Sequence, residues 1–328
     1  MKILITGVHG FVGSNLVKAL KKEHTIYGLD IIAPVKDGIR YTFSWDYVEK
    51  DGLPDVDAII HLAGKAHDVK NKSAADEYFK VNTGLTQKIF DYFLAHPDIK
   101  KFVFFSTAKA AADKVEGVLT EDVVPAPVGP YGESKIAAEK YIIEKFKEFN
   151  GLSSLREDDL EHLKPTSKDV YIFRPCMIHG PGNKGNLNLL YNVVKKGIPW
   201  PLGAFENRRT FTSVENICFA VNGVLTKEVP SGIYNMGDDE ALSTNELIEE
   251  ICKSLGKKSH IWKLPKGLMN GAAKIGDWLH LPLNSLRMQK LTENYISSNA
   301  KIKAALGVEK MPVDAREGLK VTLESFKS

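Results

Sequence analysis

The sequence predicts an α/β fold in which a parallel sheet is doubly wound, followed by a smaller, mostly helical lobe. Short apolar runs alternate with helical patterns in the first half, for example at 3–5, 57–61 and 101–107. Continuous runs of this kind are typical of strands buried on both faces. After Arg174 turn-forming residues become frequent and strands sparse. We therefore expect a first domain at 1–175 and a lobe at 176–328, with some segments of the lobe returning to the sheet.

The composition of the chain argues against several classes of protein. A net charge of +3, from 44 basic and 41 acidic residues, gives no bulk reason to expect nucleic acid or an anionic membrane as a partner, although local anion sites remain open. Cys176, Cys218 and Cys252 are odd in number and far apart, which argues against a disulfide framework. The first strand begins at Lys2, and no apolar run approaches the ~20 residues of a membrane helix. We expect a cytoplasmic protein with no membrane insertion.

The residues from 2 to 17 predict a dinucleotide-binding turn. Gly7, Gly10 and Gly13 lie between an apolar strand and an amphipathic helix, although their spacing differs from GxGxxG. Glycines at such positions let the chain turn sharply, let a pyrophosphate approach the backbone and let the helix pack against the sheet. The helix start then presents free N–H groups to the phosphates. A purely structural turn is the alternative interpretation.

Asp30 ends the next predicted strand, 25–30, and is the expected ligand of the adenosine ribose. It lies 17 positions after Gly13 and 23 after Gly7, which brackets the usual offset of about 20. Its charge would repel a 2′-phosphate, so NAD is favoured over NADP. A turn carboxylate is the alternative, and Lys36 or Arg40 could fold back to accept a phosphate.

Further candidate residues lie where predicted strands end, because ligands bind at the carboxyl edge of open parallel sheets. Leu62, Ala63 and Gly64 follow one strand and are small enough for a cofactor to lie over it, and Ser106 and Thr107 end another. Helices are predicted at about 73–96 and 131–149, and a charged, solvated excursion follows the second. In the lobe we expect helices at about 187–196, 214–225, 244–255 and 313–326.

Tyr131 and Lys135 are four residues apart and therefore share a helix face. Lowering the pKa of a phenol from ~10 to ~7 takes roughly 4 kcal/mol of phenolate stabilisation. Lys135 in a partly dry cleft, together with the positive nicotinamide of NAD⁺, could supply it. A YxxxK motif alone usually indicates two residues exposed on the surface of a helix. Downstream of the glycine turn and of a strand ending in Thr107, it predicts acid–base chemistry.

The motifs TGVHGFVG, HLAG, VNTG, FFST, YGESK and RPCMIHGPG, in this order, resemble the extended short-chain dehydrogenase/reductases. This family comprises nucleotide-sugar epimerases, dehydratases and reductases, and the likeness spans nearly the entire chain. It implies a Rossmann domain that retains NAD(P), a Ser/Thr–Tyr–Lys catalytic set, a lobe that grips a nucleoside diphosphate sugar, and no metal site. The departures are His179, where the family has a tyrosine, the STAKAAA sequence after the catalytic strand, and the lack of an evident adenine-contacting Asp near Phe43.

The resemblance assigns roles to individual residues. Thr107 would bond the reacting sugar oxygen, Tyr131 would move its proton and Lys135 would hold the nicotinamide ribose, while hydride transfer is the cofactor's chemistry. The cofactor-binding set is Gly7, Gly10, Phe11, Val12, Gly13, Asp30, Leu62, Ala63, Gly64, Asn82, Tyr131, Lys135 and Pro175. Lys109 and His67 are weaker candidates for sugar contacts. His9, His61 and His179 are interpreted as structural.

The second half resembles a subgroup that acts at C4 of UDP-N-acetylhexosamines and their 4-keto derivatives. Asn186 and Arg209 match its substrate contacts, and Arg287 matches a diphosphate-binding arginine. Arginine suits that task because its planar fork satisfies two phosphate oxygens. A surface salt bridge is the alternative for either arginine.

Three functional hypotheses follow from these observations. The first is an NAD-dependent enzyme acting at C4 of a UDP-hexose or UDP-N-acetylhexosamine as an epimerase. The second is a reductase of a UDP-4-keto-6-deoxy-N-acetylhexosamine in polysaccharide precursor synthesis. The third, less favoured because Thr107, Tyr131 and Lys135 are all present, is a non-catalytic dinucleotide sensor. The resemblance also implies a homodimer that pairs the helices at 73–96 and 131–149.

Overall fold

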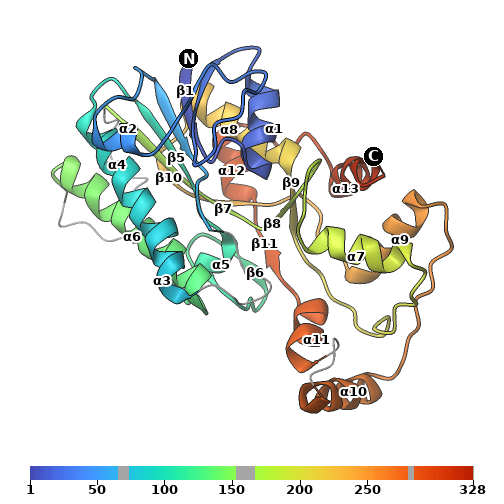
Figure 1. Ribbon diagram of the computed structural model, residues 1–328. Helices are drawn as coiled ribbons and strands as arrows, with labels where there is room; N and C mark the ends of the chain where they lie inside the picture. The colour runs from blue at the N-terminus through green and yellow to red at the C-terminus, as the bar shows by residue number, and fades with distance from the viewer. Residues whose placement is uncertain (66–73, 153–166, 280–283, 328) are drawn as a thin grey trace.

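The computed structural model describes residues 1–65, 74–152, 167–279 and 284–327. At its centre is a parallel sheet of seven strands in the order β10-β7-β5-β4-β1-β2-β3 (Figure 1). The strands are β1 (Lys2–Thr6), β2 (Thr25–Leu29), β3 (Thr42–Phe43), β4 (Ala58–His61), β5 (Lys101–Phe105), β7 (Asp169–Pro175) and β10 (Gly232–Met236). The strand order reverses between β1 and β4, so their carboxyl ends form the switch point at which ligands bind in such sheets. The expected doubly wound α/β fold is confirmed.

Alternate residues of each central strand enter two separate cores, as the period of two requires. Ile3 and Ile5 of β1 pack on the face covered by α1 (Phe11–Leu20), α8 (Val214–Thr226) and α12 (Ala300–Leu306). Leu4 packs on the opposite face, under α4 (Leu85–Ala95) and α6 (Pro130–Phe149). Burial on both faces explains why these strands appear in the sequence as unbroken apolar runs.

The helix expected at 73–96 is interrupted. It comprises α3 (Ala75–Tyr78), a π-helix η1 (Phe79–Gly84) and α4. The remaining short elements of the first half are α2 (Asp46–Glu49), α5 (Ala108–Ala111) and β6 (Val118–Leu119). The charged excursion after α6 lies mostly outside the described residues.

The C-terminal lobe is mostly helical. Its elements are β8 (Met177–His179), α7 (Asn186–Lys195), β9 (Phe211–Ser213), α9 (Thr244–Ser254), α10 (Lys266–Leu279), α11 (Ser285–Thr292), β11 (Ile296–Ser297) and α13 (Ala315–Ser325). The four lobe helices expected from the sequence correspond to α7, α8, α9 and α13, whereas α10, α11 and α12 were not predicted. In addition, β10 is an edge strand of the central sheet, and α8 and α12 pack against that sheet rather than in the lobe.

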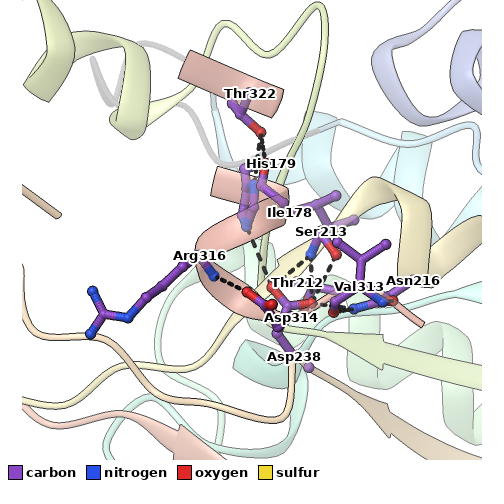
Figure 2. Close-up of polar contacts among 12 residues, drawn as sticks. Ile178, His179, Thr212, Ser213, Asn216, Asp238, Val313, Asp314, Arg316 and Thr322 are labelled. Atoms are coloured by element: carbon purple, nitrogen blue, oxygen red, sulfur yellow. Dashed lines mark hydrogen bonds and ion pairs between the residues drawn. The ribbon is translucent and has the colours of Figure 1, made fainter. Parts of the chain in front are cut away.

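His179 is a structural residue of the joint between β8, β9 and α13 (Figure 2). Its Nδ1 lies 2.9 Å from the Thr322 hydroxyl, which itself donates to the Gly318 carbonyl, so Nδ1 carries the proton. Its Nε2 faces the buried Asp238 carboxylate at 3.5 Å. Asp238 also accepts hydrogen bonds from the Ser213 backbone and hydroxyl. These hydrogen bonds hold α13 against β8 and β9.

Candidate active site

The glycine turn after β1 has the geometry that a dinucleotide requires. Gly7 has a φ of +67°, and a Cβ on it would meet the Ala63 backbone nitrogen at 3.0 Å. A Cβ on Gly13 would lie 2.6 Å from the Gly7 carbonyl oxygen, so only glycine lets α1 approach β1 this closely. Gly10 is the N-cap of α1 and places no side chain over the helix end. The amides of Phe11 and Val12 therefore begin a helix whose positive end is open to an anion.

Asp30 follows β2 directly, beside this turn. One oxygen of its carboxylate accepts the His9 backbone N–H at 3.0 Å and the other accepts the Ile31 N–H at 2.7 Å. These bonds hold the carboxylate between β2 and the glycine turn, where the sequence placed a ribose ligand. Lys36, the alternative phosphate acceptor, donates to the Ser14 hydroxyl at 2.7 Å.

A buried chain of hydrogen bonds connects β1 and β4 with the π-helix. The Thr86 hydroxyl donates to the Asn82 carbonyl at 2.6 Å, so it accepts from His61 Nε2 at 2.9 Å. His61 Nδ1 is then the acceptor for Thr6, 2.7 Å away, and Thr6 in turn accepts the Ala63 N–H. Burial and the nearby Lys135 charge lower the pKa of His61 well below its ordinary value, which agrees with this neutral tautomer.

Asn82 lies in the π-helix, and its carboxamide is fully engaged. Its oxygen accepts the Lys65 N–H at 2.7 Å, and its nitrogen donates to the Ser134 hydroxyl at 3.0 Å. Ser134 is in the first turns of α6, between Tyr131 and Lys135. A Cβ on Gly64 would lie 2.9 Å from the Asn82 oxygen and 3.1 Å from the Lys135 ammonium nitrogen. Asn82 thus positions α6 against the end of β4, and Gly64 is needed for the close approach.

Thr107 and Tyr131 are brought together at the carboxyl edge of the sheet. Thr107 follows β5 and caps α5, and Tyr131 is in the first turn of α6. Burial raises the pKa of Tyr131, and a hydrogen bond with the Thr107 side chain opposes that rise. The Tyr78 ring packs edge-on against Tyr131, with 6.4 Å between the centroids. In the protein alone, therefore, the Tyr131 phenol is neutral.

Lys135, on the same helix as Tyr131, is buried against the end of β5. Its ammonium donates to the Phe105 carbonyl at 2.8 Å and lies 4.9 Å above the Phe104 ring. Burial lowers its pKa to about 8, and the Glu139 carboxylate acts in the opposite direction. Lys135 is thus a desolvated cation, about one helical turn from Tyr131 on α6.

Glu139 and Arg174 are site residues that the sequence reasoning missed. They form a buried ion pair in which Arg174 Nη2 donates to Glu139 at 2.6 Å, and both side chains are at most 2% exposed. Glu139 also accepts from the Ser106 hydroxyl, whose strand delivers Thr107. The available signal was spacing, because Glu139 is four residues after Lys135 and eight after Tyr131. At these spacings the three side chains lie on the same face of α6, and that face is the buried one.

The remaining candidates are the cofactor residue Pro175 and the predicted substrate residues, which lie on several elements. Pro175 ends β7 and is buried, whereas Asn186 is exposed at the start of α7. The Arg209 guanidinium donates to the Lys290 carbonyl, and burial lowers its pKa. Lys109 is paired with Asp113 at 3.0 Å and lies 4.7 Å from the Tyr295 ring. Arg287 is in α11, but its side chain is outside the described part of the chain, as is the whole of His67.

Comparison with known proteins identifies the family. The profile of the NAD dependent epimerase/dehydratase family matches residues 3–237. The chain belongs to this family. A UDP-glucose 4-epimerase of Vibrio cholerae is 31% identical over 279 residues, which cover 80% of this chain and 78% of the relative.

Solved structures with the same fold come from more distant proteins. A UDP-N-acetylglucosamine 4-epimerase from Bacillus cereus matches with a TM-score of 0.75 at 22% identity, covering 100% of both chains. A UDP-glucuronic acid 4-epimerase from Bacillus cereus, in complex with NAD, matches with a TM-score of 0.73 at 21% identity, covering 100% of this chain and 99% of the other. These relatives act on several sugars, so they give no preference for N-acetylhexosamines.

As a member of the epimerase/dehydratase family, the protein is an NAD-dependent enzyme, which confirms the expected cofactor and sets the sensor hypothesis aside. The residues present fit the cofactor. The glycine turn leaves the N-terminus of α1 open, and a Cβ at Gly7 or Gly13 would collide with the backbone.

No helix in the described ranges has the length and apolarity needed to cross a membrane.

Proposed function

We propose that this family enzyme is a 4-epimerase of a UDP-hexose or UDP-N-acetylhexosamine. The observation that carries the proposal is the convergence of Thr107, Tyr131 and Lys135 beside the glycine turn, at the switch point of the sheet. The name of the Vibrio cholerae relative, a UDP-glucose 4-epimerase, supports C4 as the reacting carbon.

In this proposal each side chain has a separate task. Thr107 hydrogen-bonds the C4 oxygen and holds it beside Tyr131, which removes the hydroxyl proton and later returns it. Burial raises the pKa of that phenol, and the charge of Lys135 together with the positive nicotinamide of a bound NAD⁺ would oppose that rise. Glu139 keeps Lys135 charged, and Asn82 keeps α6 in place. A bound nicotinamide would supply hydride transfer to and from C4.

The cofactor preference follows from Asp30, and we expect NADH to bind better than NADPH. A 2′-phosphate would face the oriented carboxylate, at a cost of roughly 1 kcal/mol per charge pair, about fivefold in affinity. Asp30→Asn should reduce the preference, whereas Asp37→Asn, at an exposed acid that pairs with Lys21, should leave it unchanged. Fluorescence titration with both cofactors measures this. A clear preference of the wild type for NADPH would contradict the role of Asp30.

Arg209 is proposed as a diphosphate ligand, and Arg209→Ala should weaken binding of free UDP. Loss of charge-assisted bonds to the phosphates costs about 1.5–3 kcal/mol. The matched control is Arg208→Ala, because Arg208 is exposed and pairs with Glu246 at 3.1 Å. Calorimetry measures both variants after their unfolding temperatures have been compared. If Arg209→Ala binds UDP like Arg208→Ala, Arg209 is a structural residue and the assignment of the substrate lobe is wrong. Asn186, Lys109 and Arg287 are proposed as further substrate contacts.

The experiment that tests the proposed reaction follows the absorbance of the reduced nicotinamide during turnover. An epimerase returns the hydride to its own substrate, so product should accumulate from a UDP-sugar with no net consumption of NADH. A panel of UDP-hexoses and UDP-N-acetylhexosamines identifies the sugar. Oxidation of one NADH per product with a UDP-4-keto-6-deoxy sugar would replace the epimerase with the reductase.

A homodimer through α3, α4 and α6 is proposed as the working assembly, with the N-terminal domain at 1–175 and the substrate lobe at 176–328. These helices lie together on one side of the sheet (Figure 1). Sedimentation at micromolar concentration tests the assembly, and a monomer alone would contradict it.

A further inference from the structure

Helix α10 carries two apolar sectors, and only one of them is buried. Met269 and Ala273 pack with Leu202 and Met288 in a small core of the lobe. The second sector consists of Leu268, Ile275 and Leu279, which are 61%, 56% and 50% exposed. Their spacing of seven and eleven residues places them in one line along the helix. Beside this line Trp278 is 79% exposed. We call these four residues the outer stripe of α10.

The outer stripe lies at an extremity of the molecule. Figure 1 shows α10 at the end of the lobe, farther from the central sheet than α11, α7 and α9. Four large apolar side chains within twelve residues of one helix are each at least half exposed, unlike the single exposed apolar residues that surfaces commonly carry. A patch of this kind marks an interaction surface.

The stretch of sequence that contains α10 has a surplus of positive charge. Between residues 257 and 290 the sequence has seven Lys and Arg and a single acidic residue, Asp277, whereas the whole chain is nearly balanced at 44 to 41. Lys263, Lys266 and Lys274 are exposed, and Trp262, before the helix, is 54% exposed. Helices that lie in the headgroup layer of a membrane are typically rich in tryptophan, lysine and large aliphatic residues.

We propose that α10 docks this enzyme on the surface of an anionic phospholipid bilayer. The outer stripe enters the boundary of the acyl chains, and the lysines pair with the anionic headgroups. The helix has 14 residues, too few to span a bilayer, so it lies in the plane of the surface. A second copy of the chain is a poorer partner, because pairing α10 with itself would bring two sets of lysines together. The proposal goes beyond the proposed reaction and does not depend on it.

Vesicle co-sedimentation of the full chain tests the proposal. The wild type should bind vesicles of phosphatidylcholine mixed with phosphatidylglycerol and should bind pure phosphatidylcholine at least about tenfold less, with salt weakening the binding. The double variant Leu268→Ser/Ile275→Ser should lose about tenfold or more of that binding. The matched control is Val321→Ser, at an apolar residue of α13 that is 39% exposed.

Since the substituted side chains face solvent, NADH binding of the double variant should equal that of the wild type, which verifies its fold. Absence of the wild type from the anionic vesicle pellet would overturn the proposal, as would equal binding of the wild type and the double variant. A wild-type dimer that the double variant converts to monomer would assign the stripe to self-association instead. None of these results depends on which sugar the enzyme converts.

Discussion

Tyr131→Phe should lower turnover by about 10²- to 10⁴-fold while binding of NADH and UDP stays near that of the wild type. The substitution removes one oxygen, the group that exchanges a proton with the sugar in the proposed mechanism. It leaves the ring in its packing against Tyr78. The loss should therefore appear in kcat rather than in the binding constants. Steady-state kinetics and calorimetry measure the two effects separately.

The control for this experiment lies on the same helix. Tyr141 of α6 also carries a hydroxyl in a hydrogen bond, to Asp91 at 2.6 Å, but on the surface of the molecule. Tyr141→Phe should retain near-normal turnover. Thr107→Ala should show a loss similar in kind to that of Tyr131→Phe but smaller. Near-normal turnover of Tyr131→Phe would remove the phenol from the mechanism.

Arg174→Met should lower the free energy of unfolding by about 3–5 kcal/mol, because it leaves the Glu139 carboxylate buried without its cation. Both side chains are almost fully removed from water, and the guanidinium makes three contacts of 2.6–3.2 Å with the carboxylate. The Ser106 hydroxyl alone cannot replace those contacts. Urea denaturation followed by circular dichroism measures the change.

The matched control is Arg316→Met, which breaks the contacts of an arginine with three glutamates on the surface. Arg316 is 40% exposed and lies 2.7 Å from Glu246, so its loss should cost only about 1 kcal/mol or less. If both substitutions lowered the free energy of unfolding equally, the buried pair would contribute no more to stability than the surface contacts. A second measurement, the turnover of Glu139→Gln, reports whether the pair also supports Lys135.

The parts of the fold that were predictable from sequence depend on local chemistry. The glycine turn, the strand before it and the position of Asp30 follow from residues close in sequence, and the structure has them as expected. Helix α10 was missed because Gly267, Gly271 and Gly276 obscure its helical pattern. The buried pair of Glu139 and Arg174 joins residues 35 apart, and no local pattern reveals which acid meets which arginine. The sequence therefore suggested candidate residues for the site, but it did not reveal the buried ion pair that lies beside them.

The direction of the pKa shift of Tyr131 could not be predicted from the sequence either. From the four-residue spacing we inferred that Lys135 and the cofactor could lower the pKa of Tyr131. In the protein alone burial dominates and raises that pKa. The depth of a side chain is set by the packing of α6 against η1 and α5, which depends on segments distant in the chain.

The π-helix has a consequence for the evolution of the enzyme. A π turn contains one residue more than an α turn, and its backbone bonding is less favourable than that of a regular helix. Deleting a single residue between Phe79 and Asn82 would let one continuous α-helix run from Ala75 to Ala95 and should raise its intrinsic stability. The same deletion would move Asn82 out of the position that the bulge gives it, because a π-bulge accommodates its extra residue within one turn. The contacts of Lys65 and Asn82 would then be lost. Selection for thermal stability alone would therefore favour the regular helix, whereas selection for the contacts of Asn82 with Lys65 and Ser134 would preserve the bulge.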